Sequence, residues 1–149
     1  MLNAERILAA LRGAFAHDVG RAELLALAAK RIQAVGPPYT SVYLYMLADR
    51  QLVLEAFAGR ETEHTHIPVG RGVCGTAVAT GQDQNIPDVR AIENYIACNT
   101  FTRSELVVLI RRGPAILGQI DVDSDLPNPF TAEEEAAVRR VADGLAVLL

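Results

Sequence analysis

Cysteine is scarce in this sequence of 149 residues, and tryptophan is absent. The two cysteines, Cys74 and Cys98, have 23 residues between them, and a single such pair does not make a disulfide framework. In a reducing compartment they are either redox-active thiols or ordinary buried residues. Only 5% of the residues are aromatic, half are hydrophobic and about a fifth are charged, a profile typical of a compact soluble protein.

Long apolar runs, basic clusters and metal-ligand spacings are missing as well. No run approaches the roughly 18 apolar residues that span a bilayer, and no signal peptide is recognisable, so we expect a cytoplasmic protein with no membrane partner. The net charge is -4 and adjacent arginines occur only at 111–112 and 139–140, which argues against a nucleic-acid partner. His64 and His66 have no cysteine or third histidine at a usual ligand interval, so no metal site is expected.

The length suits one ordinary domain, and we expect residues 1–149 to form a single one. Helical and alternating apolar patterns follow one another in a clear order. The predicted elements are a helix capped by Asn3, a helix over 21–35, a hairpin over 41–47 and 51–58, a short extended piece over 65–67, a helix over 73–80 that stops at Gly81, an edge strand or turn over 85–87, a partly helical loop over 88–103, strands over 104–110 and 115–124, and a helix over 131–149 capped by Thr131. Tight turns between consecutive strands favour an antiparallel sheet, and helices at both ends of the chain favour coverage of one face. The predicted fold class is α+β.

Three carboxylates lie in segments otherwise too apolar to be solvated surface. They are Glu105, Asp121 and Asp123, and acids in such places need a reason. Asp121 and Asp123 are two apart on a predicted strand, so they point to the same face, and Glu105 on the neighbouring strand can join them in one acidic cluster. The alternative is that the two aspartates cap the turn toward Pro127.

The order of elements resembles that of a GAF domain, and several separated motifs resemble the free methionine-(R)-sulfoxide reductase family. These motifs are residues 67–77, 88–89, 96–98, 104–108 and 120–124. The resemblance implies a central antiparallel sheet with the terminal helices on one face and a ligand pocket under loops on the other. It also implies that Cys98 is the catalytic cysteine, that Glu105, Asp121 and Asp123 hold the substrate, and that Tyr39 and Tyr43 line the pocket.

The sequence departs from the family pattern at several positions. The main resolving cysteine of the family is His64 here, the histidine usual before Ile96 is Tyr95, the aspartate usual after Cys98 is Asn99, and a usual proline is Leu109. Reduction of a sulfoxide needs a thiolate that attacks sulfur and a protonated carboxyl that serves the departing oxygen, for which Glu105 is our first choice. The remaining acids suit the ammonium group of a free amino acid.

Two routes for clearing the resulting sulfenic acid stay open. Cys74 lies near the N-terminus of a short helix, where the helix dipole favours a thiolate, so it can attack Cys98 and form a disulfide that thioredoxin reduces. Alternatively, an external thiol reduces Cys98 directly. Neither route needs a bound cofactor, and the expected partners are free methionine sulfoxide and a thioredoxin-like reductant.

Plainer interpretations remain for the same residues. Each cysteine can be structural, Tyr39 and Tyr43 can be core residues, and His64 and His66 can be solvated loop residues. At the level of function, the alternative to the enzyme is a non-catalytic GAF module that binds a small amino-acid-like ligand; a chain of this length without room for an output domain favours the enzyme. The amphipathic N-terminal helix and the GAF resemblance make a homodimer an expectation.

Overall fold

The computed structural model describes residues 1–92, 95 and 100–149. The helices are α1 (Ala4–Ala16), α2 (Arg21–Gln33), α3 (Gly72–Thr80), the short 3-10 helix η1 (Val89–Ala91) and α4 (Ala132–Leu148). The strands are β1 (Ser41–Ala48), β2 (Gln51–Ala58), β3 (His66–Pro68), β4 (Gln84–Ile86), β5 (Ser104–Arg112) and β6 (Ala115–Ser124).

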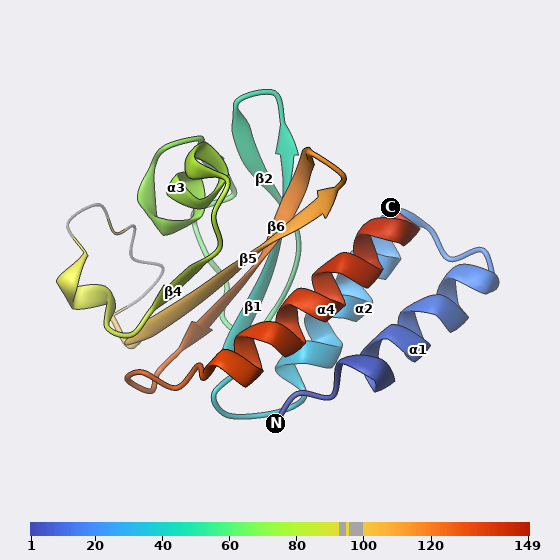
Figure 1. The fold of residues 1–149 in the computed structure, drawn as a ribbon, viewed down its shortest axis with the longest axis horizontal. Coiled ribbons are helices and arrows are strands. Elements are labelled where there is room, and N and C mark those ends of the chain that lie inside the picture. Colours follow the sequence, from blue (N-terminus) through green and yellow to red (C-terminus); the bar gives the residue numbers. More distant parts are fainter. Residues whose placement is uncertain (93–94, 96–99) are drawn as a thin grey trace.

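The strands form one antiparallel sheet in the order β3-β2-β1-β6-β5-β4. Two hairpins, β1–β2 and β5–β6, lie side by side through the β1–β6 pairing, and the short strands β3 and β4 are the edges. Helices α2 and α4 pack on the sheet and α1 packs on both of them, whereas α3 lies on the opposite face (Figure 1). This confirms the predicted α+β class with the N- and C-terminal helices on one face.

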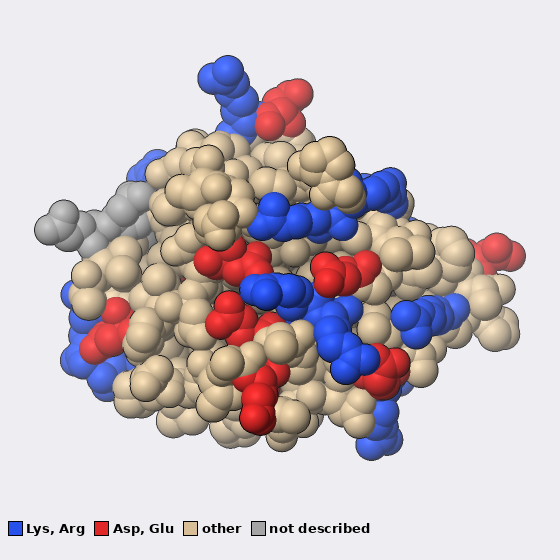
Figure 2. Space-filling view, viewed as in Figure 1, with Lys and Arg blue, Asp and Glu red and all other residues tan. Residues whose placement is uncertain are grey.

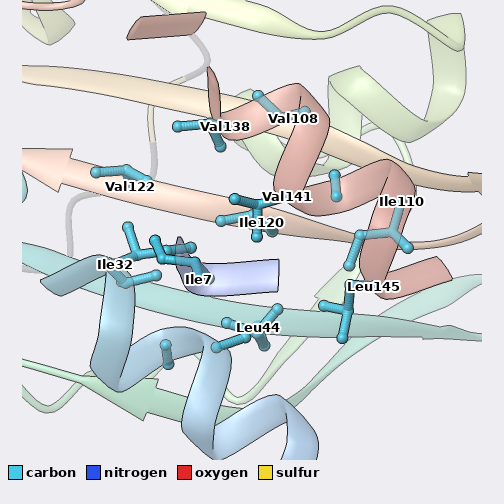
Figure 3. Close-up of a cluster of buried hydrophobic side chains, with 14 of the residues drawn as sticks. Ile7, Ile32, Leu44, Val108, Ile110, Ile120, Val122, Val138, Val141 and Leu145 are labelled. Carbon is cyan, nitrogen blue, oxygen red and sulfur yellow. The ribbon is translucent and has the colours of Figure 1, made fainter. Parts of the chain in front are cut away.

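The helix-side core is aliphatic because alternate residues of the central strands point toward the helices. Strand positions such as Leu44, Val108 and Ile120 pack against Val141 of α4 and Ile32 of α2 (Figure 3). Their neighbours in sequence, one residue away, point to the other face of the sheet. The sheet therefore has two chemically different faces, and the second one carries the candidate site.

Local signals predicted most element boundaries correctly. Asn3 Oδ1 accepts a hydrogen bond from the Arg6 N–H at 3.1 Å, and Thr131 Oγ1 accepts one from the Glu134 N–H at 3.2 Å, as expected of N-cap residues. Gly81 ends α3 in the left-handed conformation with φ 68°. Two boundaries were wrong by two residues. Helix α2 ends at Gln33 rather than at 35. Strand β5 continues past Ile110 to Arg112, because Arg111 and Arg112 still pair with β6 after a register shift at Ile110/Arg111.

The predicted loop over 88–103 is described only in part. Its first turn is η1, with Asp88 as N-cap. Cys98 and Asn99 lie outside the described residues, as do the other residues of 93–94 and 96–99. The predicted position of Cys98 therefore stays a prediction.

The charged surface residues are mixed in sign. Over the face on which α4 lies, basic and acidic side chains are interspersed (Figure 2). The ion pair between Arg139 and Asp83 at 2.5 Å ties α4 to the segment before β4, and Arg140 pairs with Glu5 of α1. Among the described residues, we find no helix with the length and hydropathy needed to cross a membrane.

Candidate functional site

The antiparallel register brings the three predicted acids onto one face of the sheet. Asp121 and Asp123 are two apart on β6, so both point away from the helices. Glu105 of β5 lies directly opposite Asp123. All three are buried, with exposures of 4% for Glu105, 2% for Asp121 and 1% for Asp123. The predicted acidic cluster is therefore present, and the alternative that these aspartates cap the following turn is wrong.

Cys74 joins the cluster from the helix above it. The Cys74 Sγ donates a hydrogen bond to Asp121 Oδ2 at 3.2 Å. One ligand atom each from Cys74, Glu105 and Asp121 lies within 4.8 Å of the other two. These three residues line a small cavity together with Tyr45, His64, Ile67, Gly72 and Val73.

Close packing explains why α3 presents Cys74 at this point. A Cβ atom added at Gly75 would lie 2.5 Å from the Pro68 carbonyl oxygen, so only glycine lets the first turn of α3 sit on the end of β3. The Gln119 side chain of β6 donates from Nε2 to the Cys74 carbonyl oxygen at 3.1 Å. The helix is thereby held between β3 and the central strands.

Burial and mutual repulsion shift the protonation of the acids. Burial raises the pKa of Glu105 well above its usual value, and the nearby carboxylates of Asp121 and Asp123 raise it further. The pKa of Asp121 is raised for the same two reasons, burial first and Asp123 second. Glu105 is close enough to both aspartates to interact with their charges. Such a group holds a proton that isolated surface carboxyls would lose.

The expectation of a thiolate at Cys74 is corrected by its surroundings. Burial raises the pKa of the Cys74 thiol well above its usual value, and the charges of Asp121 and Glu105 raise it further. The position at the third residue of α3 favours the thiolate, but that local effect is outweighed here. Cys74 is a buried thiol that donates a hydrogen bond.

Aromatic rings extend the face next to the acids. Tyr43 of β1 lies opposite Asp121, and Tyr45 lies opposite Gln119. The two rings have centroids 6.3 Å apart. Their hydroxyls donate to carbonyl oxygens of the β2–β3 loop, Tyr43 to Arg60 and Tyr45 to His64, both at 2.7 Å. Sequence reasoning singled out Tyr43 but missed Tyr45, which the two-residue period of a strand places on the same face.

The structure places Tyr39 elsewhere, which corrects its assignment to the pocket. Its ring packs with Phe130 at a centroid distance of 5.9 Å in the helix-side core, and its hydroxyl donates to Glu134 of α4. Tyr39 precedes the first residue of β1, so the alternation that orients Tyr43 does not apply to it. Of the five predicted substrate-binding residues, Glu105, Asp121 and Asp123 form the acidic cluster. Tyr43 lies beside that cluster, and Tyr39 lies on the other face of the sheet.

The β2–β3 loop closes one side of the site. Arg60 forms a two-pronged ion pair with Asp125, at 2.7 and 2.5 Å, and its guanidinium lies 5.3 Å from the centroid of the Phe101 ring. His64 of the same loop was considered a solvated residue, but it is half-buried and lines the cavity with Cys74. Nothing in the local sequence around His64 indicates that burial.

Comparison with known proteins identifies the family to which this fold belongs. A family model of the GAF domain matches residues 20–149. The structure of a type II free methionine-R-sulfoxide reductase from Thermoplasma acidophilum superposes with a TM-score of 0.81 at 36% identity, covering 85% of this chain and 89% of that one. The chain belongs to the GAF family of free methionine-R-sulfoxide reductases.

Two further relatives of this GAF domain bear on its function. The free methionine-R-sulfoxide reductase of Escherichia coli is 42% identical over 105 residues, which are 70% of this chain and 63% of that protein. The chain therefore matches somewhat less than two thirds of the length of that curated relative. A free methionine-R-sulfoxide reductase from Neisseria meningitidis, solved in complex with its substrate, superposes with a TM-score of 0.87 at 28% identity over 97% of this chain and 87% of that one.

Proposed function

We propose that this GAF domain reduces free methionine-(R)-sulfoxide to methionine. The observation that carries the proposal is the buried cluster of Glu105, Asp121 and Asp123 on the face of the sheet that also bears Tyr43 and Tyr45. Such a cluster is costly to fold, because like charges are brought together away from water. A cationic ligand offsets that cost, and the related reductases named above give the ligand its chemical class.

The acids suit the ammonium group of a free amino acid. Asp121 and Asp123 face the same space, and a substrate cation between them would replace the proton that the buried cluster otherwise needs. A methionine residue inside a peptide has no charged nitrogen, so the same site would discriminate against it. The cavity between the described residues has room for about one water molecule, so entry of the substrate requires the surrounding segments to open.

In the proposed reaction the Cys98 thiolate attacks the sulfoxide sulfur, and the oxygen leaves as the enzyme sulfenic acid. One sulfoxide, one thiolate and one proton give one methionine and one sulfenic acid. Glu105 is the proposed donor of the proton, because burial and two neighbouring acids raise the pKa of its carboxyl and so favour the protonated form. The aromatic side chains Tyr43 and Tyr45 can pack on the S-methyl group, since contacts between sulfur and aromatic rings are favourable.

The enzyme returns to its reduced form when two external thiols reduce the sulfenic acid to the thiol, are themselves oxidised to a disulfide, and release one water molecule. The burial of Cys74 and its hydrogen bond to Asp121 support this direct route over attack by a Cys74 thiolate. A thioredoxin-like dithiol in the cytoplasm is the proposed physiological reductant.

Purified protein with dithiothreitol and each epimer of free methionine sulfoxide tests the proposal. We expect turnover of the R epimer, little turnover of the S epimer or of N-acetylated methionine sulfoxide, and loss of turnover in Cys98→Ser. Tight binding of the R epimer without turnover would overturn the reductase proposal and favour a ligand-sensing module. Circular dichroism of Cys98→Ser separates loss of chemistry from loss of fold.

A further inference from the structure

A thiol and two carboxyls meet at the small buried cavity beside Cys74. The three residues, Cys74, Glu105 and Asp121, are all buried, and their ligand atoms are mutually within 4.8 Å. Among the described residues that line the cavity there is no lysine or arginine. Two carboxyls and a thiol in such a space need protons or a cation between them.

A further buried oxygen at the cavity points to a cation as the missing partner. Asp121, which lines the cavity, is only 2% exposed, and its Oδ1 has no hydrogen-bond donor among the described residues. Buried acceptors without donors are uncommon in folded proteins.

We infer that Cys74, Glu105 and Asp121 form a binding site for a divalent transition-metal ion of the Zn²⁺ type. A thiolate with two carboxylates is a donor set that Zn²⁺ accepts, and a water molecule can take the fourth position. With Zn–S about 2.3 Å and Zn–O about 2.1 Å, two ligand atoms of a tetrahedral ion lie about 3.5 Å apart. The Cys74 Sγ and Asp121 Oδ2, at 3.2 Å, are already close to that spacing.

The size of the cavity and the ligand types also exclude other occupants. The cavity has room for about one water molecule, which suits a single ion better than an organic molecule. Mg²⁺ and Ca²⁺ require six or more oxygen ligands, and a site with a sulfur donor disfavours both. Binding of Zn²⁺ converts the Cys74 thiol to a thiolate and releases its proton to solvent.

Metal binding does not depend on the proposed function, but the two share residues. A metal ion at Asp121 and Glu105 would exclude the substrate ammonium from the same carboxylates. We therefore expect Zn²⁺ to inhibit sulfoxide reduction competitively with the substrate. Metal binding itself is tested by a spectroscopic signal that does not depend on turnover.

The test adds Co²⁺, and separately Zn²⁺, to reduced, metal-free protein. Co²⁺ should bind in a one-to-one ratio with a sulfur-to-cobalt charge-transfer band in the near ultraviolet, and Zn²⁺ should displace it. Cys74→Ser should abolish the band, and Asp121→Asn and Glu105→Gln should each weaken Zn²⁺ binding at least tenfold in competition with a chromogenic chelator. Mg²⁺ and Ca²⁺ should displace neither ion.

Matched controls distinguish this site from other thiols and acids. Asp49 lies in the exposed β1–β2 turn, and Glu23 lies in the first turn of α2. The variants Asp49→Asn and Glu23→Gln should therefore bind Co²⁺ and Zn²⁺ as the unmodified chain does. Cys98→Ser should keep the charge-transfer band. A band that survives Cys74→Ser and disappears in Cys98→Ser, or the absence of stoichiometric Co²⁺ binding by folded protein, would overturn the inference. If the metal-site inference fails, the proposed sulfoxide reduction can still be tested, because turnover is measured without added metal.

Discussion

Glu105 of β5 and Asp123 of β6 lie directly opposite each other in the antiparallel ladder, and both side chains are buried. Bringing two carboxyls together away from water costs free energy, either as repulsion or as the protonation that avoids it, so this pair weakens the fold. A stability deficit of this kind is common where a protein keeps a site for a ligand.

Asp123→Asn should therefore stabilise the fold while it impairs substrate binding. We expect the free energy of unfolding to increase by about 0.5–1 kcal/mol, because one of the clustered carboxyls is removed and the new amide can donate to the Glu105 carboxyl. Urea unfolding at neutral pH measures the change, with Asp49→Asn as the control. A loss of stability in Asp123→Asn would mean that the Asp123 carboxyl is well compensated in the folded protein.

Glu105→Gln should abolish most of the proposed reductase activity without loss of fold. The amide keeps the shape of the side chain but cannot deliver a proton to the sulfoxide oxygen, and general acids contribute about 10²–10⁴-fold to rates. We expect the decrease in kcat, with a smaller change in KM. Steady-state kinetics against the R epimer measure both constants. If Glu105→Gln stays within twofold of the unmodified chain while Glu23→Gln does the same, Glu105 is not the donor.

Oxidation by one equivalent of substrate, with no reductant present, should leave an added oxygen on Cys98. The buried Cys74 thiol is a poor nucleophile, so the sulfenic acid should persist long enough to react with dimedone. Mass spectrometry of the intact protein and its peptides separates this product from a disulfide, which has lost two hydrogens. A Cys74–Cys98 disulfide as the main product would show that Cys74 acts as the resolving cysteine.

Tyr39→Phe should reduce stability without altering substrate binding. The hydroxyl of Tyr39 donates to the buried Glu134 carboxylate, and burial and that carboxylate raise the pKa of Tyr39, so the proton stays on the tyrosine. Loss of the donor should cost about 1–3 kcal/mol in free energy of unfolding. Urea unfolding and KM for the R epimer are the two measurements. An increase in KM without a change in stability would return Tyr39 to the pocket.

Asp125→Asn should weaken the dependence of stability on acid pH. The hydrogen bonds from Arg60 lower the pKa of Asp125 in the folded protein. A lowered pKa gives stability that is present above the unfolded value of about 3.9 and is lost as pH falls through the folded value. Because the Arg60 and Asp125 side chains are partly exposed to solvent, their ion pair contributes at most about 1 kcal/mol to the free energy of unfolding. Unfolding curves between about pH 5 and pH 2 should fall less steeply for Asp125→Asn than for the unmodified chain.

Local chemistry made much of the fold predictable. The cap residues Asn3 and Thr131, the stop at Gly81 and the two-residue period of the strands act over a few neighbouring residues, and the elements they predicted are present. The same period is sufficient to place Asp121 and Asp123 on one face of the sheet. Tyr39 shows the limit of that rule, because it lies before the first residue of β1, where alternation no longer holds.

The sequence by itself determined the α+β class, the order of elements and the identity of the three clustered acids, because these follow from short-range periodicity and from separated motifs that resemble a known family. Only the tertiary structure decided how the segments meet. The pairing of β5 with β6 set Glu105 against Asp123, and the seating of α3 on β3 buried Cys74 among acids and overrode the local helix-dipole effect. Burial and the charges of distant segments govern the chemistry of a side chain as strongly as its neighbours in sequence do, and they exist only after the chain has folded.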